Sequence, residues 1–249
     1  MAYPPPQGAN RSAKMPAMRV FMLRHAESRS NAEPGAVSLP ESEGDQLSER
    51  GERQAEAAAE LIPSFGPARI VCSPMRRARQ TAAPLAERCG MEVETWDWIH
   101  ELVEPTGYER LSADEQQRQR WSNRMLAAAD DPGHAPEGGE SFDALVARVD
   151  RTFVRLAADD VDNTVLVAHG IFLRFAFART VFGDVFNPRL IDRLWRIGSL
   201  NCGLSVFEHT TDGPSLNPAD IDGWRCVTWM APTVPPDQVT GTGGGGPGN

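Results

Sequence analysis

The sequence predicts an α/β fold: a three-layer α/β/α sandwich with a mainly parallel sheet and a small helical cap. Largely apolar runs of strand length lie at 20–23, 69–72 and 164–168. Runs of this kind, flanked by polar residues, are typical of strands that are buried on both faces of a parallel sheet. Stretches with helical spacing separate the runs, and helices in those places would cover the two faces of the sheet.

Length and composition are those of an ordinary globular protein. The 249 residues are enough for one large domain or two small ones. Hydrophobic residues make up 41% of the chain and charged residues 24%, which is usual for a water-soluble domain. The formal net charge of −9 argues against nucleic acid or an anionic membrane as a partner. The sequence carries no signal for the oligomeric state.

The cysteines and the apolar stretches bear on the compartment. The four cysteines form no Cys-x-x-Cys pair and have no metal-ligand spacing, which fits reduced and mostly packed thiols. Prolines interrupt residues 1–16, where a signal peptide needs an apolar core. The most apolar stretch, 165–178, contains His169 and Arg174 and is too short to span a bilayer. We therefore expect a soluble cytoplasmic protein that needs no cofactor and no metal ion.

Residues that favour helix starts define several boundaries. Ser48 is expected to cap a helix over 49–61, and Ser73 and Pro74 are expected to open the next helix. In a helix that begins at Ser141, four apolar residues recur at helical spacing and are predicted to be core: Leu145, Val149, Phe153 and Leu156. The other expected elements are helices over 73–88, 141–158 and 171–181, and strands over 92–98, 203–207 and 225–230, of which the last two form a hairpin.

The two ends of the chain are expected to be disordered. Residues 1–16 and the Pro- and Gly-rich residues 231–249 contain too little apolar surface to order themselves. The single domain between them spans 17–230. Within it, a polar, Gln- and Arg-rich helical stretch at 108–130 predicts a cap, inserted at about 104–138, at the rim of the fold.

Two of the five histidines follow directly after buried strands. Arg24 and His25 end the first apolar run, and His169 ends the run at 164–168. In open α/β sheets, ligands bind just beyond the carboxyl ends of the strands. A lone buried histidine is more often a satisfied core residue, which is the alternative for His169. Two histidines in matching positions nevertheless predict a shared site.

Four motifs carry a resemblance to a known family. They are Leu23-Arg24-His25-Ala26-Glu27-Ser28 with Asn31, then Ser73-Pro74-Met75-Arg76-Arg77-Ala78-Arg79-Gln80-Thr81-Ala82, then Gly138-Gly139-Glu140-Ser141, and then Ala168-His169-Gly170. In the order and spacing of these motifs, from about Met18 to Phe207, the chain resembles the histidine phosphatase superfamily. That superfamily includes the cofactor-dependent phosphoglycerate mutases and many phosphatases.

Phosphoryl transfer needs a nucleophile, fixed cations around the phosphate oxygens and an acid for the leaving oxygen. His25 suits the first role, because a neutral imidazole nitrogen is nucleophilic at about pH 7. An arginine fork matches two phosphate oxygens, which suits Arg24 and Arg77, although Arg77 is alternatively a solvated charge on a helix. The resemblance implies that His25 is phosphorylated and that the phosphate pocket is formed by Arg24, Asn31, Arg77, His169 and Gly170.

The resemblance also implies a glutamate as proton donor, in a Leu-x-Glu setting after the strand that follows the arginine helix. The corresponding residues here are Ile99-His100-Glu101, so Glu101 is the candidate. The like charge of a bound phosphate dianion favours the protonated carboxyl group that a general acid requires. Glu104, three residues on, is the alternative donor.

The chain departs from the family pattern in two places. Ala26 replaces the more usual glycine after the nucleophile, which is a small change. The Phe-Thr-Gly-Trp stretch of the mutases is absent from the loop at 32–46, which carries four acidic residues and no basic one: Glu33, Glu41, Glu43 and Asp45. We expect this loop to line the rim of the active site, where acidic side chains are poorly suited to hold a second anion. Alternatively, the loop lies away from the pocket.

The expected function is therefore metal-independent hydrolysis of a phosphomonoester through a phosphohistidine intermediate. The alternatives are a phosphoglycerate mutase and a non-catalytic, phosphate-binding regulatory module. The expected partner is a small phosphorylated substrate. No readable motif in the loop or the cap identifies that substrate.

Overall fold

The computed structural model describes residues 18–32, 45–107, 128–210, 221 and 223–242. Within these residues the main element is a six-stranded sheet with the order β3-β2-β4-β1-β6-β7, and β5 and β8 form a separate pair. The strands are β1 (Met18–Arg24), β2 (Arg69–Cys72), β3 (Val93–Thr95), β4 (Thr164–Ala168), β5 (Ser199–Leu200), β6 (Gly203–His209), β7 (Trp224–Pro232) and β8 (Gly241–Thr242).

The direction of the strands confirms the predicted, mainly parallel sheet. β4 lies between β2 and β1 and pairs in parallel with both, and β3 pairs in parallel with β2. β6 runs antiparallel to β1 and to β7, so β6 and β7 form the predicted hairpin. Every residue of β4 and all but one of β1 are buried, as the apolar runs predicted.

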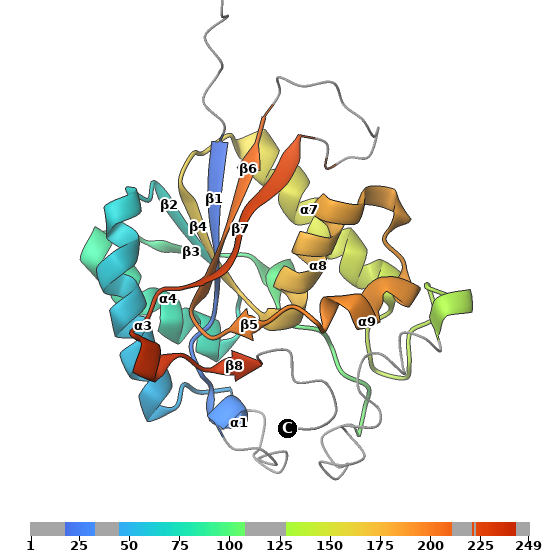
Figure 1. The fold of residues 1–249 in the computed structure, drawn as a ribbon, viewed down its shortest axis with the longest axis horizontal. Coiled ribbons are helices and arrows are strands. Elements are labelled where there is room, and N and C mark those ends of the chain that lie inside the picture. Colours follow the sequence, from blue (N-terminus) through green and yellow to red (C-terminus); the bar gives the residue numbers. More distant parts are fainter. Residues whose placement is uncertain (1–17, 33–44, 108–127, 211–220, 222, 243–249) are drawn as a thin grey trace, which may run out of the picture.

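Helices cover both faces of the sheet, which confirms the three-layer sandwich. In Figure 1, α3 (Glu49–Leu61) and α4 (Arg76–Cys89) lie on one side of the sheet, and α7 (Phe142–Asp159) and α8 (Gly170–Phe182) lie on the other. The other helical segments of the described residues are short: α1 (Arg29–Ala32), η2 (Ile62–Phe65), η3 (Asp97–Ile99), η5 (Ala128–Asp130), η6 (Gly183–Val185), η7 (Pro188–Leu190), α9 (Ile191–Leu194) and η8 (Pro236–Gln238).

A hydrophobic core lies on each side of the sheet. On the side of α7 and α8, the four residues predicted from helical spacing are all fully buried: Leu145, Val149, Phe153 and Leu156. On the other side, α3 contributes small buried side chains: Ala55, Ala58 and Ala59. Removal of this apolar surface from water on both faces stabilises the sheet that carries the strand ends.

The start of α4 differs from the prediction. Ser73 and Pro74 were expected to open this helix, but it begins at Arg76 with Met75 at the N-cap. The prediction is wrong because the Ser73 hydroxyl has another partner: its Oγ lies 2.7 Å from Nε2 of His169, on the neighbouring strand end. By contrast, Ser48 does cap α3, where its Oγ accepts a hydrogen bond from the Gly51 backbone at 3.0 Å.

The prediction that the chain is disordered from Ala231 is wrong as far as Thr242. β7 continues to Pro232, and β8 pairs with β5. Hydrogen bonds, rather than large apolar side chains, hold this segment: Nε2 of Gln54 donates to the Gln238 carbonyl at 2.7 Å and to the Thr240 hydroxyl at 2.8 Å. Composition alone gave no sign of these bonds. Residues 243–249 and the predicted tail at 1–16 lie outside the described residues.

The predicted cap is described only in part. Residues 108–127, which hold most of the helical stretch expected at 108–130, lie outside the described residues, and η5 is its described end. The strand predicted at 92–98 is shorter, because β3 ends at Thr95 and the buried Trp96 leads into η3.

Three further findings concern groups that the sequence singled out. All four cysteines are free, and Cys72 and Cys202 are buried. Within the described ranges, no helix has the length and apolar character needed to cross a membrane. In the same ranges, no three His, Cys, Asp or Glu side chains are grouped as a metal site would require.

Candidate active site

The parallel pairing of β1 and β4 brings the two predicted histidines together. Arg24 lies opposite Ala168 in the register, so the next residues, His25 and His169, emerge side by side at the carboxyl edge of the sheet. Their ring centroids are 5.1 Å apart, with the ring planes inclined at 53°. Both side chains are buried. The two histidines predicted to share a site are therefore neighbours in the structure.

The hydrogen bonds of His25 define which of its nitrogens carries the proton. Nδ1 lies 2.7 Å from the Ala26 carbonyl oxygen, which can only accept, so Nδ1 carries the proton. Nε2 is then unprotonated, and it accepts a hydrogen bond from Nε of Arg77 at 3.2 Å. Burial, reinforced by the charges of Arg77 and Arg24, holds the pKa of His25 well below its usual value. The ring is therefore neutral near neutral pH, with the lone pair of Nε2 directed at an arginine.

Arg77 joins the site to the acidic loop. Nη1 of Arg77 forms an ion pair with Asp45, and the Asp45 carboxylate also accepts a hydrogen bond from the Arg76 backbone at 2.7 Å. Asp45 is one of the four acidic residues of the loop at 32–46, so the end of this loop adjoins the pocket. Asp45 therefore does not lie away from the pocket, contrary to the alternative for this loop. Residues 33–44 of the loop lie outside the described residues.

Arg24 is a second buried cation whose charge acts on His25. Its Nη1 donates to the Ser199 carbonyl, while Nε is buried without a hydrogen-bond partner among the described residues. Burial lowers the pKa of Arg24 to about 10, and the charge of Arg77 adds to this effect, whereas Glu101 opposes it. A Cβ atom on Gly170 would lie 3.2 Å from Nε of Arg24, so the glycine permits the close approach that was expected of it.

His169 presents a buried nitrogen that has no protein partner in the described part of the chain. Nε2 of His169 lies 2.7 Å from Oγ of Ser73, and this oxygen already accepts a hydrogen bond from the Met75 backbone at 3.3 Å. A hydroxyl oxygen can accept two hydrogen bonds and donate one, so either atom can be the donor of this bond, and Nδ1 is the ring nitrogen without a partner. Burial, followed by the charge of Arg77, lowers the pKa of His169 well below its usual value.

Asn31 is linked to the backbone of His25 through Asn201. Nδ2 of Asn201 donates to the His25 carbonyl at 3.1 Å and to Oδ1 of Asn31 at 3.4 Å. Asn31 itself lies on α1 and is exposed. Asn31 thus reaches the His25 backbone only through Asn201, and its predicted place in the phosphate pocket stays a prediction.

Glu101 reaches the first turn of α8. Its carboxylate accepts hydrogen bonds from the backbone N–H groups of Ile171 at 3.1 Å, Phe172 at 3.2 Å and Leu102 at 3.1 Å. The N-terminus of a helix attracts negative charge, and α8 begins directly after His169. The carboxylate is therefore held at the start of α8, the helix that follows His169.

Sequence reasoning missed Arg174, on the first turns of α8. Its side chain is only 6% exposed, its Nη2 donates to the Ile197 carbonyl at 3.3 Å, and its guanidinium lies 4.6 Å from the centre of the Trp195 ring. Burial, and after it the charge of Arg24, lowers the pKa of Arg174 to about 10. The signal that could have found this residue is its spacing of four from Gly170, which places both on one helix face.

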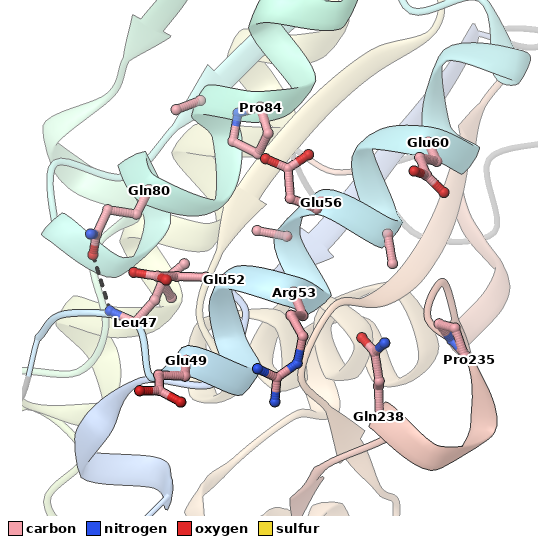
Figure 2. Close-up of a pocket in the computed structure, with 13 residues that line it drawn as sticks. Leu47, Glu49, Glu52, Arg53, Glu56, Glu60, Gln80, Pro84, Pro235 and Gln238 are labelled. Carbon is pink, nitrogen blue, oxygen red and sulfur yellow. Dashed lines mark hydrogen bonds between the residues drawn. The ribbon is translucent and has the colours of Figure 1, made fainter.

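The structure also contains a groove that none of the predicted site residues lines. The groove, of about 950 Å³, lies between α3, α4 and the segment around Gln238 (Figure 2). Four of its lining side chains are glutamates of α3: Glu49, Glu52, Glu56 and Glu60. Such an acidic wall repels a phosphate dianion, so the strand ends, and not this groove, are the candidate site.

The fold and the site define an α/β protein with a neutral histidine at the carboxyl edge of its sheet, bonded to Arg77 and close to the charge of Arg24. A family model for the histidine phosphatase superfamily (branch 1) matches residues 20–220. The chain belongs to the histidine phosphatase superfamily.

The probable phosphoglycerate mutase GpmB of Photorhabdus laumondii is 30% identical over 202 residues, which cover 77% of this chain and 85% of that protein. The GpmB protein of Serratia proteamaculans is 30% identical and covers 85% of this chain and 92% of its own length.

Solved structures show the same fold. One described as mycobacterial hydrolase 2 is 29% identical, with a TM-score of 0.68 and coverage of 90% of this chain and 95% of its own. A mycobacterial glucosyl-3-phosphoglycerate phosphatase is 27% identical, with a TM-score of 0.64 and coverage of 87% and 100%. A phosphoserine phosphatase from Entamoeba histolytica, at 17% identity and a TM-score of 0.63, supports the fold alone.

The lowered pKa values of His25 and His169 predict acid sensitivity. In the unfolded chain both rings take up a proton below about pH 6.5, while in the folded protein they stay neutral to a lower pH. The unfolded chain then binds more protons, so the free energy of unfolding falls as the pH drops below about 6.5, by about 1.4 kcal/mol per pH unit for each ring. Urea unfolding between pH 7 and 5 measures this slope. The slope should be shallower in His169→Gln, and an unchanged slope would contradict the assignment.

Proposed function

We propose that the protein is a phosphatase that hydrolyses a phosphomonoester, without a metal ion, through a phosphohistidine on His25. The observation that carries the proposal is the state of Nε2: it is unprotonated, fixed by the bond from Nδ1 to the Ala26 carbonyl, and directed at Arg77. A phosphate oxygen that takes the place of Nε2 as the acceptor for Arg77 brings the phosphorus next to the nucleophile. Superfamily membership is consistent with this chemistry.

The surrounding charges suit a phosphate dianion. Arg24 and Arg77 are buried or nearly buried cations close enough for their charges to act on His25, and guanidinium groups in such surroundings bind phosphate oxygens strongly. Nε of Arg24 and Nδ1 of His169 are buried nitrogens without protein partners in the described ranges, and a bound phosphate would supply oxygen acceptors for N–H groups there. A phosphate bound beside His25 would therefore meet both the charge and the hydrogen-bonding needs of this part of the sheet edge.

The proposed reaction has two steps. In the first, the lone pair of His25 Nε2 forms a bond to phosphorus, the bond from phosphorus to the ester oxygen breaks, and the protonated Glu101 gives its proton to that oxygen. The alcohol leaves, and His25 carries the phosphoryl group. In the second, a water molecule gives a proton to Glu101 and bonds to phosphorus, and the nitrogen–phosphorus bond breaks to return the electron pair to Nε2.

Hydrolysis, rather than transfer within a phosphoglycerate, is supported by the loop at the rim. Asp45 is paired with Arg77, so at least one carboxylate of the acidic loop stands beside the phosphate site. A negative charge there disfavours a second anionic group on the substrate and leaves the intermediate open to water. The similar solved structures that carry a substrate name at 27% identity are phosphatases.

Arg174 favours the second candidate, a phosphoglycerate mutase. A mutase must hold the carboxylate of a three-carbon acid while its phosphoryl group moves. Arg174 is a buried cation close enough to Arg24 for the two charges to interact, on the helix that begins beside His169. The curated relatives named above are described as probable phosphoglycerate mutases.

A direct test separates the two candidates. We expect incubation with 3-phosphoglycerate, with and without 2,3-bisphosphoglycerate, to give little 2-phosphoglycerate, while a general phosphatase substrate releases inorganic phosphate steadily. Phosphorus NMR follows all the species together. The arginines supply the positive charge, so the rate should persist in a chelating buffer, and vanadate should inhibit.

Three outcomes would contradict the proposal. Rapid interconversion of the phosphoglycerates with almost no free phosphate would identify a mutase. Loss of the rate on chelation, with recovery on adding Mg²⁺ or Zn²⁺, would show that the arginines and histidines alone do not suffice. A protein that binds vanadate but turns over no phosphomonoester would instead be the non-catalytic module. The cytoplasmic location stays an expectation, to be measured by fractionation.

A further inference from the structure

The proposed proton donor lies on a segment that has no helix or strand of its own. Residues 101–105, between η3 and the turn at Gly107, form neither element. The carboxylate of Glu101 is bonded to α8, but the backbone that carries it depends on contacts from elsewhere in the fold. A general acid must lie within hydrogen-bond reach of the leaving oxygen, and a misplacement of about 1 Å can cost about 100-fold in rate. What holds this backbone is therefore a functional question.

Arg148 holds the backbone on the upstream side of Glu101. This arginine lies on α7, and its side chain is only 13% exposed. Its Nη1 donates to the carbonyl of Trp98 at 2.6 Å and to the carbonyl of His100 at 3.0 Å. These carbonyls belong to residues three positions and one position before Glu101. A single guanidinium nitrogen thus fixes the chain directly before the donor.

Glu140 holds the same backbone on the downstream side. Its backbone N–H donates to the Val103 carbonyl at 3.0 Å, and its carboxylate accepts from the Val103 N–H at 3.4 Å. Glu140 and Arg148 are in turn joined by a two-bonded pair, Nε to Oε1 at 2.6 Å and Nη2 to Oε2 at 2.7 Å. The two residues therefore enclose Glu101 between residues that they contact on either side.

The pair also contacts the helix that receives the Glu101 carboxylate. The Arg148 guanidinium lies 5.6 Å from the centre of the Phe172 ring, and Phe172 is one of the residues whose backbone N–H binds Glu101. The Arg148 guanidinium thus contacts both the backbone next to Glu101 and a residue whose N–H binds the Glu101 side chain. Glu140 belongs to the Gly138-Gly139-Glu140-Ser141 motif, for which the reaction steps above provide no role.

We propose that Glu140 and Arg148 form a positioning pair that sets the carboxyl group of Glu101 against the leaving oxygen. The inference rests on the proposed function, because it assigns the pair to the protonation step of that reaction. Stability alone is a poor reason for this arrangement, since a buried ion pair contributes little net stability compared with well-packed apolar side chains. Geometric control of one carboxyl group accounts for all of the contacts of the pair named above.

The test compares leaving groups in Arg148→Lys. A lysine keeps the charge, but its single ammonium cannot form the two-bonded pair with Glu140 and reach both carbonyls. We expect kcat for an alkyl phosphate to fall about 10- to 100-fold with KM within about threefold, because the donor is displaced while the phosphate pocket is intact. For nitrophenyl phosphate, whose leaving oxygen needs little help from an acid, the first-turnover release of nitrophenol should slow by about threefold or less.

A double variant and a matched control sharpen the test. If Arg148 acts through Glu101, then Arg148→Lys should add almost nothing to the loss already caused by Glu101→Gln. The control is Arg179→Lys, which breaks a similar pair: Arg179 donates to both carboxylate oxygens of Asp150, at 2.8 and 3.0 Å, near the far end of α8. It should lower the thermal midpoint comparably and leave the ratio of alkyl to nitrophenyl rates unchanged.

The outcomes divide cleanly. Equal losses for both leaving groups, a normal rate in Arg148→Lys, or the same pattern in Arg179→Lys would overturn the positioning role. If Arg148→Lys does not fold, Glu140→Gln, which keeps the shape of the pair, takes its place with the same expectation. Absence of phosphate release by the unaltered protein would overturn the proposed function itself, and the inference with it. Failure of the positioning pair alone would instead leave the unaltered protein active and the alkyl-to-nitrophenyl ratio of Arg148→Lys unchanged.

Discussion

Replacement of His25 by alanine should abolish phosphate release and the covalent intermediate together. The reason is that Nε2 of His25 is the nitrogen positioned to attack, with Nδ1 protonated and bonded to the Ala26 carbonyl. Loss of a nucleophile costs at least about 10⁴-fold in turnover, even when the rest of the site still binds the substrate. Rapidly quenched wild-type protein, incubated with ³²P-labelled substrate, should hold phosphate that is labile in acid and stable in alkali. The His25→Ala protein should hold none.

A matched control is available in the same sheet. His209 lies opposite Met18 in the register of β6 and β1, at the end of the sheet away from His25, and packs on the Trp224 ring at 4.9 Å. His209→Ala should keep both the label and the rate. Binding of vanadate by His25→Ala would show that Arg24 and Arg77 still form the anion site. Label on a serine or an aspartate, or a labelled His25→Ala, would contradict the phosphohistidine.

The strand ends were predictable because the physics there is local. An apolar run that stops at Arg24 and His25, and a second that stops at His169, each mark the exit of a buried strand, and parallel pairing then brings the exits together. The core face of α7 was predictable for the same reason, since it depends on periodicity within one helix. The resemblance added Arg77, whose charge alone does not distinguish it from its neighbours on the helix.

Contacts made across the fold were not predictable from one sequence. The Ser73 hydroxyl lies near both a helix start and His169. Only the pairing of β2 with β4 brings it within hydrogen-bond distance of His169. The order of the chain to Thr242 likewise depends on Gln54, almost two hundred residues earlier, which no local pattern connects to the Pro- and Gly-rich end. Arg174 was counted only as a break in an apolar stretch, because its burial beside Arg24 is a tertiary property.

The second large effect is expected for Glu101→Gln, which should lower turnover by about 10²- to 10⁴-fold for alkyl phosphates. An amide has no acidic proton to give to the leaving oxygen and cannot take one from water. It also presents an NH₂ group to one of the backbone N–H groups of Leu102, Ile171 and Phe172 that the carboxylate now accepts. Some loss of thermal stability is therefore expected, and it must be separated from the loss of the acid.

The leaving group makes that separation. If the missing proton is the cause, Glu101→Gln should hydrolyse nitrophenyl phosphate much faster than an alkyl phosphate. The phosphoenzyme should also accumulate, because the attack of water on it has lost its base. A merely distorted pocket would slow both substrates equally and weaken vanadate binding. Glu104→Gln, three residues on, is the control and should be close to the unaltered protein. A near-normal Glu101→Gln beside a crippled Glu104→Gln would move the proton donor to Glu104.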